Sequence, residues 1–352
     1  MCISKVEAQK IPLYVGTYTA AQESQGIYEL EFNTKTADIQ FKQVVNMANP
    51  SFIARNENVL LAVSELVDGK QALNSYQIHS DGLKLLNSLP TGGQAPCHVI
   101  IDNQHSKYAV VSNYLGGALD LYALNEDGSI KSLDHSVQFK GSSTNKARQE
   151  ASHVHSAFEG PDQEIYVSDL GTDQIHVMKI VTNGNKYKFE EKEIIPTPKG
   201  AGPRHLTFHP NGKWLYALME LTGEIVMYSR EKDYWKQQQI ISMNDAAFTG
   251  NNGAADIKIS SNGKHVYATN RGDANTITLF KVLKNGQLQQ DQVTSVMGNG
   301  PRNFNFSPDE KFVLVGNQNT NEIVVFHRNS KNGVLKDSGK RYAIFKPVCL
   351  IF

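Results

Sequence analysis

The sequence predicts an all-β fold made of repeated four-stranded units that close into a ring. Three observations lead to this expectation: a strand pattern repeated about every 50 residues, turn signals at matching places within the repeats, and a last apolar segment suited to pair with the first ones. Apolar runs of strand length alternate with polar turns throughout, and no segment requires a helix.

The repeat is clearest in three segments that begin at Gly202, Gly253 and Gly300. Each holds three apolar runs separated by a polar turn and a polar cluster, which is a strand meander. With three weaker copies and a shortened last one, the units begin at intervals of 46 to 55 residues, at Pro50, Pro96, Ala151, Pro203, Ala254, Pro301 and Pro347. Four antiparallel strands at this period predict a seven-bladed β-propeller.

The shortened copy, PVCLIF from Pro347, predicts how the ring closes. It should supply the innermost strand of a blade whose other strands are IPLYVGTYT from Ile11 and GIYELEF from Gly26. Pairing the two ends of the chain in this way leaves no exposed sheet edge. The length alone would allow two domains, but the repeats assign residues 11–352 to one propeller and residues 1–10 to an N-terminal extension.

A second set of turn signals marks the step from the third to the fourth strand of a unit. These signals are Asp81-Gly82, Asp127-Gly128, Asn183-Gly184, Asn285-Gly286 and Asn332-Gly333. Runs such as VLLAVSE and KFVLVGN are apolar on both faces, as expected where each blade packs between two neighbours. The one long interval contains GSSTNKARQE at residues 141–150, which we interpret as a loop in a position to overhang a site.

Charge and cysteine content exclude several classes of function. The 35 basic and 35 acidic side chains balance, which argues against a broad surface for nucleic acid. No run of 18 apolar residues occurs and residues 1–10 lack the apolar stretch of a signal peptide, so we expect a cytoplasmic protein without membrane association. Cys2, Cys97 and Cys349 are far apart and show no Cys-x-x-Cys spacing, so we expect reduced thiols.

Polar side chains gather at one mouth of the predicted channel, because the start of the first strand lies beside the end of the second in an antiparallel meander. The strand starts carry His98, His153, His155, Arg204, His205, Asp256, Arg302 and Asn303. The second-strand ends carry Thr17, Tyr18, Glu65, Asn113, Asp169, Glu220, Asn270, Arg271, Asn317 and Gln318. Histidines and arginines beside Glu220 are the groups expected of a small-molecule active site. For single members such as Asp256 or Asn317, the competing interpretation is a structural tie between blades.

The same histidines allow a metal site as an alternative interpretation. His153 and His155, two apart on one strand, would project to one face and could bind a metal ion with His98 or His205. No carboxylates accompany them at ligand spacing, and a histidine in a polar channel needs no metal. We therefore expect no metal and no cofactor.

Six short motifs together carry a family resemblance. They are GTYT (Gly16 to Thr19), SNY (Ser112 to Tyr114), HVHS (His153 to Ser156), DLGTD (Asp169 to Asp173), GPRH (Gly202 to His205) and NRG (Asn270 to Gly272). From Tyr14 to the closing PVCLIF, the chain resembles the seven-bladed propeller lactonases, which include bacterial 6-phosphogluconolactonases of the propeller type and a fungal carboxymuconate lactonising enzyme. The fold of this family agrees with the one that the repeats predict independently.

The resemblance implies catalytic roles for His155, Arg204 and Glu220. It also implies an arginine that corresponds to Arg271, with Arg302 as a competitor. Further substrate contacts are expected from His153, His205, His98, Asn113, Tyr18 and Asp169. The segment at residues 253–256 lacks the Pro-Arg of its neighbours, which leaves the number of cations in the pocket open.

The implied activity is hydrolysis of a sugar δ-lactone, foremost 6-phospho-D-glucono-1,5-lactone to 6-phosphogluconate in the pentose phosphate pathway. Glu220 or His155 would take a proton from water, and Arg204 would stabilise the oxyanion. The phosphate would be held by Arg271, with Arg302 or His205 as an additional contact.

Two alternatives to this activity stay open. The same residues could serve a carboxy-cis,cis-muconate cyclase, and the propeller could instead be a non-catalytic binding scaffold.

The expected partner is a small anionic lactone. A closed ring offers no sheet edge that demands a second chain, so a monomer is expected.

Overall fold

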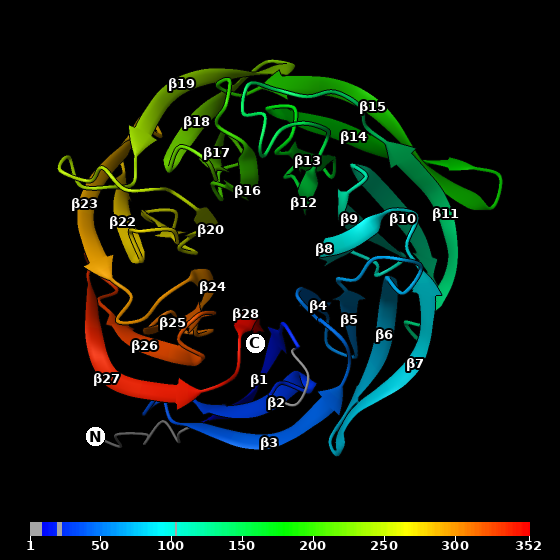
Figure 1. Ribbon diagram of the computed structural model, residues 1–352, viewed down its shortest axis with the longest axis horizontal. Coiled ribbons are helices and arrows are strands. Elements are labelled where there is room, and N and C mark those ends of the chain that lie inside the picture. The colour runs from blue at the N-terminus through cyan, green and yellow to red at the C-terminus, as the bar shows by residue number, and fades with distance from the viewer. Residues whose placement is uncertain (1–8, 20–22, 103) are drawn as a thin grey trace, which may run out of the picture.

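The computed structural model describes residues 9–352 except residues 20–22 and residue 103. Its strands form seven four-stranded antiparallel sheets arranged around a central channel (Figure 1). The described residues contain no helix, and hence no helical segment long and apolar enough to cross a membrane. The seven-bladed β-propeller predicted from the repeats is confirmed.

One sheet combines the two ends of the chain, in the order β28 (Pro347–Ile351), β1 (Lys10–Thr17), β2 (Gly26–Asn33) and β3 (Ile39–Asn46). Each of the other six sheets uses four consecutive strands, innermost first. The next three sheets are β4 (Ile53–Arg55), β5 (Val59–Ser64), β6 (Ala72–His79) and β7 (Gly82–Pro90); β8 (Gln94–Ile101), β9 (Tyr108–Leu115), β10 (Ala118–Leu124) and β11 (Ile130–Gln138); and β12 (Val154–Glu159), β13 (Ile165–Asp169), β14 (Gln174–Asn183) and β15 (Lys186–Pro196). The last three are β16 (Pro203–Phe208), β17 (Trp214–Met219), β18 (Glu224–Glu231) and β19 (Tyr234–Ser242); β20 (Ala254–Ile259), β21 (His265–Asn270), β22 (Thr276–Val282) and β23 (Leu288–Ser295); and β24 (Pro301–Phe306), β25 (Phe312–Asn317), β26 (Glu322–Arg328) and β27 (Leu335–Ala343).

The predicted boundaries agree with these strands. Every innermost strand begins within three residues of a predicted unit start, and all five predicted turn signals fall between the third and fourth strands of a blade. At Gly286 the backbone φ is +86°, and an added Cβ would come within 2.4 Å of the Trp214 ring. Only glycine fits this turn without a shift of its surroundings.

The ring closes as the sequence predicted, with β28 antiparallel to β1 and Leu350 opposite Val15. In Figure 1 the two ends of the chain meet in one blade, where the last strand lies on the channel side of the first. Residues 1–8 of the predicted extension over residues 1–10 lie outside the described residues, and β1 begins at Lys10.

Apolar side chains fill the spaces between adjacent blades. Tyr166 and Ile175 of one blade, for example, pack with Leu215 and Trp235 of the next. Buried tyrosine hydroxyls add hydrogen bonds between blades, such as the 2.7 Å bond from Tyr216 to the carbonyl of Gly286. Since the blades are packed on both faces, the channel is held by a rigid frame.

Truncation of Leu350 tests the contribution of ring closure to stability. Leu350 is 2% exposed and packs with Leu13 and Val15, so Leu350→Ala should lower the free energy of unfolding by about 2–5 kcal/mol. Leu283→Ala, at a position that is 40% exposed, is the matched control and should change it by less than about 0.5 kcal/mol. Urea unfolding of both variants checks this, and equal midpoints would contradict the closure role.

Candidate active site

A β-bulge near the start of the innermost strands directs side chains toward the channel. In five blades the pairing with the second strand shifts there and leaves one residue of the innermost strand without a partner in the ladder. In four of them these residues are Cys97, His155, Arg204 and Arg302, and in the blade that closes the ring it is Val348. Three of these bulge residues, His155, Arg204 and Arg302, were predicted as site residues, and they owe their direction to the same local irregularity.

The ends of the second strands complete the site, as the meander predicts. Bulge residues and strand ends together line a cavity of about 400 Å³ at this mouth of the channel. Its lining consists of Glu65, Cys97, Tyr114, Arg148, His155, Glu220, Arg271 and Arg302. We call it the arginine cavity.

The Glu220 carboxylate is the centre of charge in the arginine cavity. Its Oε1 lies 2.7 Å from Arg148 Nη2, and its Oε2 lies 2.9 Å from Arg204 Nε and 3.3 Å from Arg271 Nη2. Burial raises the pKa of this carboxyl group, but the charges of Arg271, Arg204 and Arg148 outweigh burial and lower it to about 2. Glu220 is therefore ionised at neutral pH.

His155 is a neutral imidazole beside this carboxylate. Burial, followed by the charges of Arg204 and His205, holds the pKa of His155 well below 6.5. Its Nε2 lies 3.9 Å from Glu220 Oε2, and its Nδ1 has no hydrogen-bond partner in the described part of the chain. A neutral imidazole with an unoccupied nitrogen is available as a proton acceptor.

Arg148 was not among the residues selected from the sequence. It belongs to the loop at residues 141–150, which we predicted only as a segment in a position to overhang a site. Gln149, next to it, donates hydrogen bonds to the carbonyl of Leu170 (2.9 Å) and to Asp173 Oδ1 (2.7 Å). This anchor places Arg148 against Glu220 and against the Tyr114 hydroxyl, 3.3 Å away.

Arg302 also lines the arginine cavity, but its contacts differ from those of the arginines that pair with Glu220. Its Nη2 donates to the Tyr18 hydroxyl (2.8 Å), and its guanidinium carbon lies 5.2 Å from the centre of the Tyr18 ring. The Tyr18 hydroxyl in turn donates to Glu65 Oε2 (2.8 Å). Among the described residues, Arg302 forms no ion pair with a carboxylate, so its remaining donors are free for a ligand anion.

His205 and Asp256 lie behind Arg204 and do not line the arginine cavity. Asp256 Oδ1 accepts from His205 Nδ1 (2.9 Å), and Arg204 Nη1 lies 3.2 Å from His205 Nε2. Burial, then Arg204, lowers the pKa of His205 to about 4, so the ring is neutral. His205 thus links the Asp256 carboxylate to the guanidinium of Arg204, which makes it a positioning residue in this structure.

Four other expected substrate contacts lie outside the arginine cavity. His98 lines a different cavity. Asn113 donates to the carbonyl of Ala118 and to Asp120 within its own blade. Asp169 accepts from the backbone N–H of His153 (2.8 Å) and from two neighbours, which ties a strand start to a strand end. His153 stacks on Tyr114, and its ring nitrogens contact the Tyr114 carbonyl and Glu150.

The strand is not regular at the point where His153 and His155 were expected to share one face. The bulge between Val154 and Ser156 breaks the simple alternation of side chains, and His153 precedes the strand. Both rings contact Tyr114, but their carboxylate neighbours differ, since His153 contacts Glu150 and His155 faces Glu220. Across the described residues, no group of three or more His, Cys, Asp or Glu side chains is arranged to hold a metal ion.

A propeller with a carboxylate, a neutral imidazole and several arginines at one mouth of its channel has the groups of an enzyme that acts on a small anion. The chain belongs to the family of seven-bladed β-propeller lactonases, which it matches over residues 12–352. It is 34% identical to the 6-phosphogluconolactonase of Formosa agariphila, over 92% of this chain and 94% of that protein. It is 33% identical to the 6-phosphogluconolactonase of Bacillus subtilis, over 96% of this chain and 97% of that protein.

Solved structures show the same likeness. A crystal structure from Bacteroides fragilis, assigned as a 6-phosphogluconolactonase, superposes with a TM-score of 0.91 at 32% identity and covers 99% of both chains. The periplasmic gluconolactonase of Pseudomonas aeruginosa superposes with a TM-score of 0.91 at 28% identity, over 97% of this chain and 99% of that one. The protein is therefore a lactonase, a hydrolase that opens cyclic esters.

Removal of Arg148 tests whether the 141–150 loop belongs to the site. Arg148→Ala should lower kcat/KM for a lactone roughly tenfold or more, because one of the three cations that hold Glu220 is lost. Lys146→Ala removes an exposed cation from the same loop and should leave the rate unchanged. Initial rates of acid release for both variants measure the difference, and full activity of Arg148→Ala would show that the loop only covers the site.

Proposed function

We propose that this lactonase hydrolyses 6-phospho-D-glucono-1,5-lactone to 6-phosphogluconate, a step of the pentose phosphate pathway. The observation that carries the proposal is the excess of positive charge at the site. Arg148, Arg271 and Arg302 line the arginine cavity and Arg204 lies against Glu220, whereas Glu65 and Glu220 are its two carboxylates. A phosphate monoester with about two negative charges would balance this excess.

Arg302 is our candidate for the phosphate contact. Arg271 and Arg148 already pair with Glu220, whereas the guanidinium of Arg302 contacts the hydroxyl and ring of Tyr18. A guanidinium offers several donors in one plane, which suits a phosphate group. For this reason we propose Arg302 rather than Arg271 as the phosphate contact.

In the reaction, His155 would accept a proton from a water molecule that attacks the lactone carbonyl. Arg204 would stabilise the oxyanion of the tetrahedral intermediate. When the ring C–O bond breaks, His155 would return the proton to the leaving ring oxygen, which becomes the hydroxyl group of the open-chain acid. The new carboxyl group then loses its proton to solvent.

The ionised Glu220 supports His155 in this step. With a pKa of about 2, Glu220 is a poor proton acceptor itself, but its charge would stabilise the imidazolium that forms 3.9 Å away. The arginines oppose that imidazolium as long as their charges are unbalanced. A bound phosphate would balance them, so substrate binding itself would make His155 a stronger base.

Two further expectations belong to this proposal. A phosphorylated substrate fits a cytoplasmic enzyme, whereas the Pseudomonas relative is named as periplasmic and as a gluconolactonase. The unphosphorylated glucono-1,5-lactone is therefore the second candidate substrate. That the protein is a monomer and binds neither nucleic acid nor membranes stays a prediction.

Glu220→Gln and His155→Ala test the catalytic pair. Each should lower kcat by a factor of about 10² to 10⁴, the usual contribution of an essential general base or its partner. His79→Ala, which removes an exposed histidine at the end of β6, is the control and should keep full activity. Acid release from freshly prepared 6-phosphogluconolactone, corrected for spontaneous hydrolysis, gives the rates. Full activity in both site variants, with native near-ultraviolet circular dichroism, would disprove the assignment.

Arg302→Gln tests the choice of substrate. The variant should raise KM for the phosphorylated lactone about tenfold or more and change KM for glucono-1,5-lactone by less than about twofold, because only the former carries the phosphate. The test is to measure KM for both lactones with the wild type and with the variant. A wild type that prefers the unphosphorylated lactone would favour the second candidate.

A further inference from the structure

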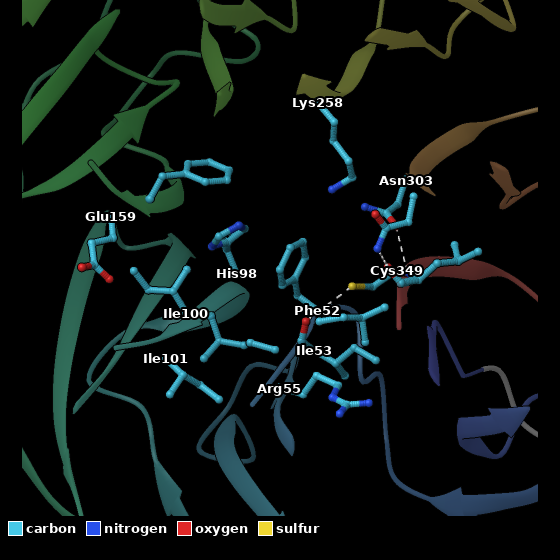
Figure 2. Close-up of a pocket in the computed structure, with 16 residues that line it drawn as sticks. Phe52, Ile53, Arg55, His98, Ile100, Ile101, Glu159, Lys258, Asn303 and Cys349 are labelled. Carbon is cyan, nitrogen blue, oxygen red and sulfur yellow. Dashed lines mark hydrogen bonds between the residues drawn. The ribbon is translucent and has the colours of Figure 1, made fainter. Parts of the chain in front are cut away.

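A second cavity lies at the other mouth of the channel, where the innermost strands end. It has a volume of about 310 Å³ and is lined from the ends of β4, β8, β12, β24 and β28, with Lys258 from β20. Figure 2 shows these side chains around a common space. None of them lines the arginine cavity, and His205 and Asp256 lie between the two sites. We call it the distal cavity.

One wall of the distal cavity is apolar and aromatic. The ring of Phe52 lies 4.1 Å from the ring of His98, measured between centroids, and the ring of Phe158 lies 5.0 Å from it on another strand. Ile53, Ile100 and Leu350 extend this surface. The volume of the distal cavity, about 310 Å³, falls at the lower end of the range for small-molecule pockets, roughly 300–1,000 Å³.

His98, which lines this wall, carries an unused hydrogen-bond donor. The backbone N–H of Ala157 points to His98 Nδ1 (3.5 Å), which places the ring proton on Nε2. Nε2 has no hydrogen-bond partner in the described part of the chain, although His98 is only 1% exposed. A buried donor without a partner costs free energy unless a ligand or water satisfies it.

Lys258 supplies a cation across the distal cavity from His98 (Figure 2). Its side chain is 30% exposed, and Nζ lies 3.4 Å from Asp256 Oδ2. Asp256 is also engaged by His205 and Asn303, so Lys258 is one of several donors to this carboxylate. The ammonium group thus keeps donors that can reach a ligand.

We propose that the distal cavity binds a small carboxylate with a flat apolar body. The carboxylate accepts from Lys258 Nζ and His98 Nε2, and the apolar body packs against Phe52 and Phe158. An unused buried donor, a facing cation and an aromatic wall are together what such a ligand requires. The site is distinct from the one that hydrolyses the lactone and does not depend on the identity of that lactone.

Naphthalene-2-carboxylate is the probe, and naphthalene-2-carboxamide is its uncharged match. Titration calorimetry on the wild type should show the carboxylate binding about tenfold or more tightly than the carboxamide, since the charged acceptor makes the stronger hydrogen bonds. Lys258→Met should remove this preference, and His98→Phe, which keeps an aromatic ring, should weaken carboxylate binding severalfold. The comparison of the two probes on the wild type does not depend on how the variants fold.

Two control variants separate the distal cavity from other sites. Lys281→Met removes a lysine of β22 that pairs with Asp291 on the surface, and Arg302→Gln alters the arginine cavity. Both should bind naphthalene-2-carboxylate as the wild type does. No binding to the wild type, equal affinity for the two probes, or loss of binding in Arg302→Gln would overturn the proposal.

Discussion

The chemistry of this propeller depends on a bulge at the start of its innermost strands. A regular strand would alternate its side chains between the two faces of a blade, where the neighbouring blades bury them. The bulge takes one residue out of the ladder, and in four of the blades that residue is Cys97, His155, Arg204 or Arg302. One backbone irregularity, repeated around the ring, thus gives an apolar scaffold a polar centre. The identity of the bulge residue can then differ from blade to blade while the scaffold stays the same.

The charges gathered in this way stabilise one another. Arginines and a carboxylate removed from water carry a large desolvation cost, which only close pairing offsets. Glu220 contacts Arg148, Arg204 and Arg271, and Arg204 is backed by His205 and Asp256. Such a network is set before a substrate arrives, so its dipoles and charges need little reorganisation during the reaction.

The sequence was sufficient for the architecture because a repeated pattern gives the same information several times. It was also sufficient for Glu220, His155, Arg271 and Arg302 as neighbours at one mouth, because strand starts and strand ends must meet in a meander. Arg148 was out of reach, since its position depends on how Gln149 binds Asp173, two residues from different segments. His98 and His205 lie on the same strands as Cys97 and Arg204, but they lie deeper along the channel and do not line the arginine cavity. Strand periodicity alone does not give that depth.

Closure of the ring by β28 has a consequence for how the protein is made. The first three strands of the closing blade are synthesised before the other six sheets, whereas their innermost partner follows all six. Until then Val15 and its neighbours on β1 lack the strand that covers them. A nascent chain stalled before Pro347 should therefore hold six complete sheets and an open seventh, and would be a natural client for a chaperone that shields sheet edges.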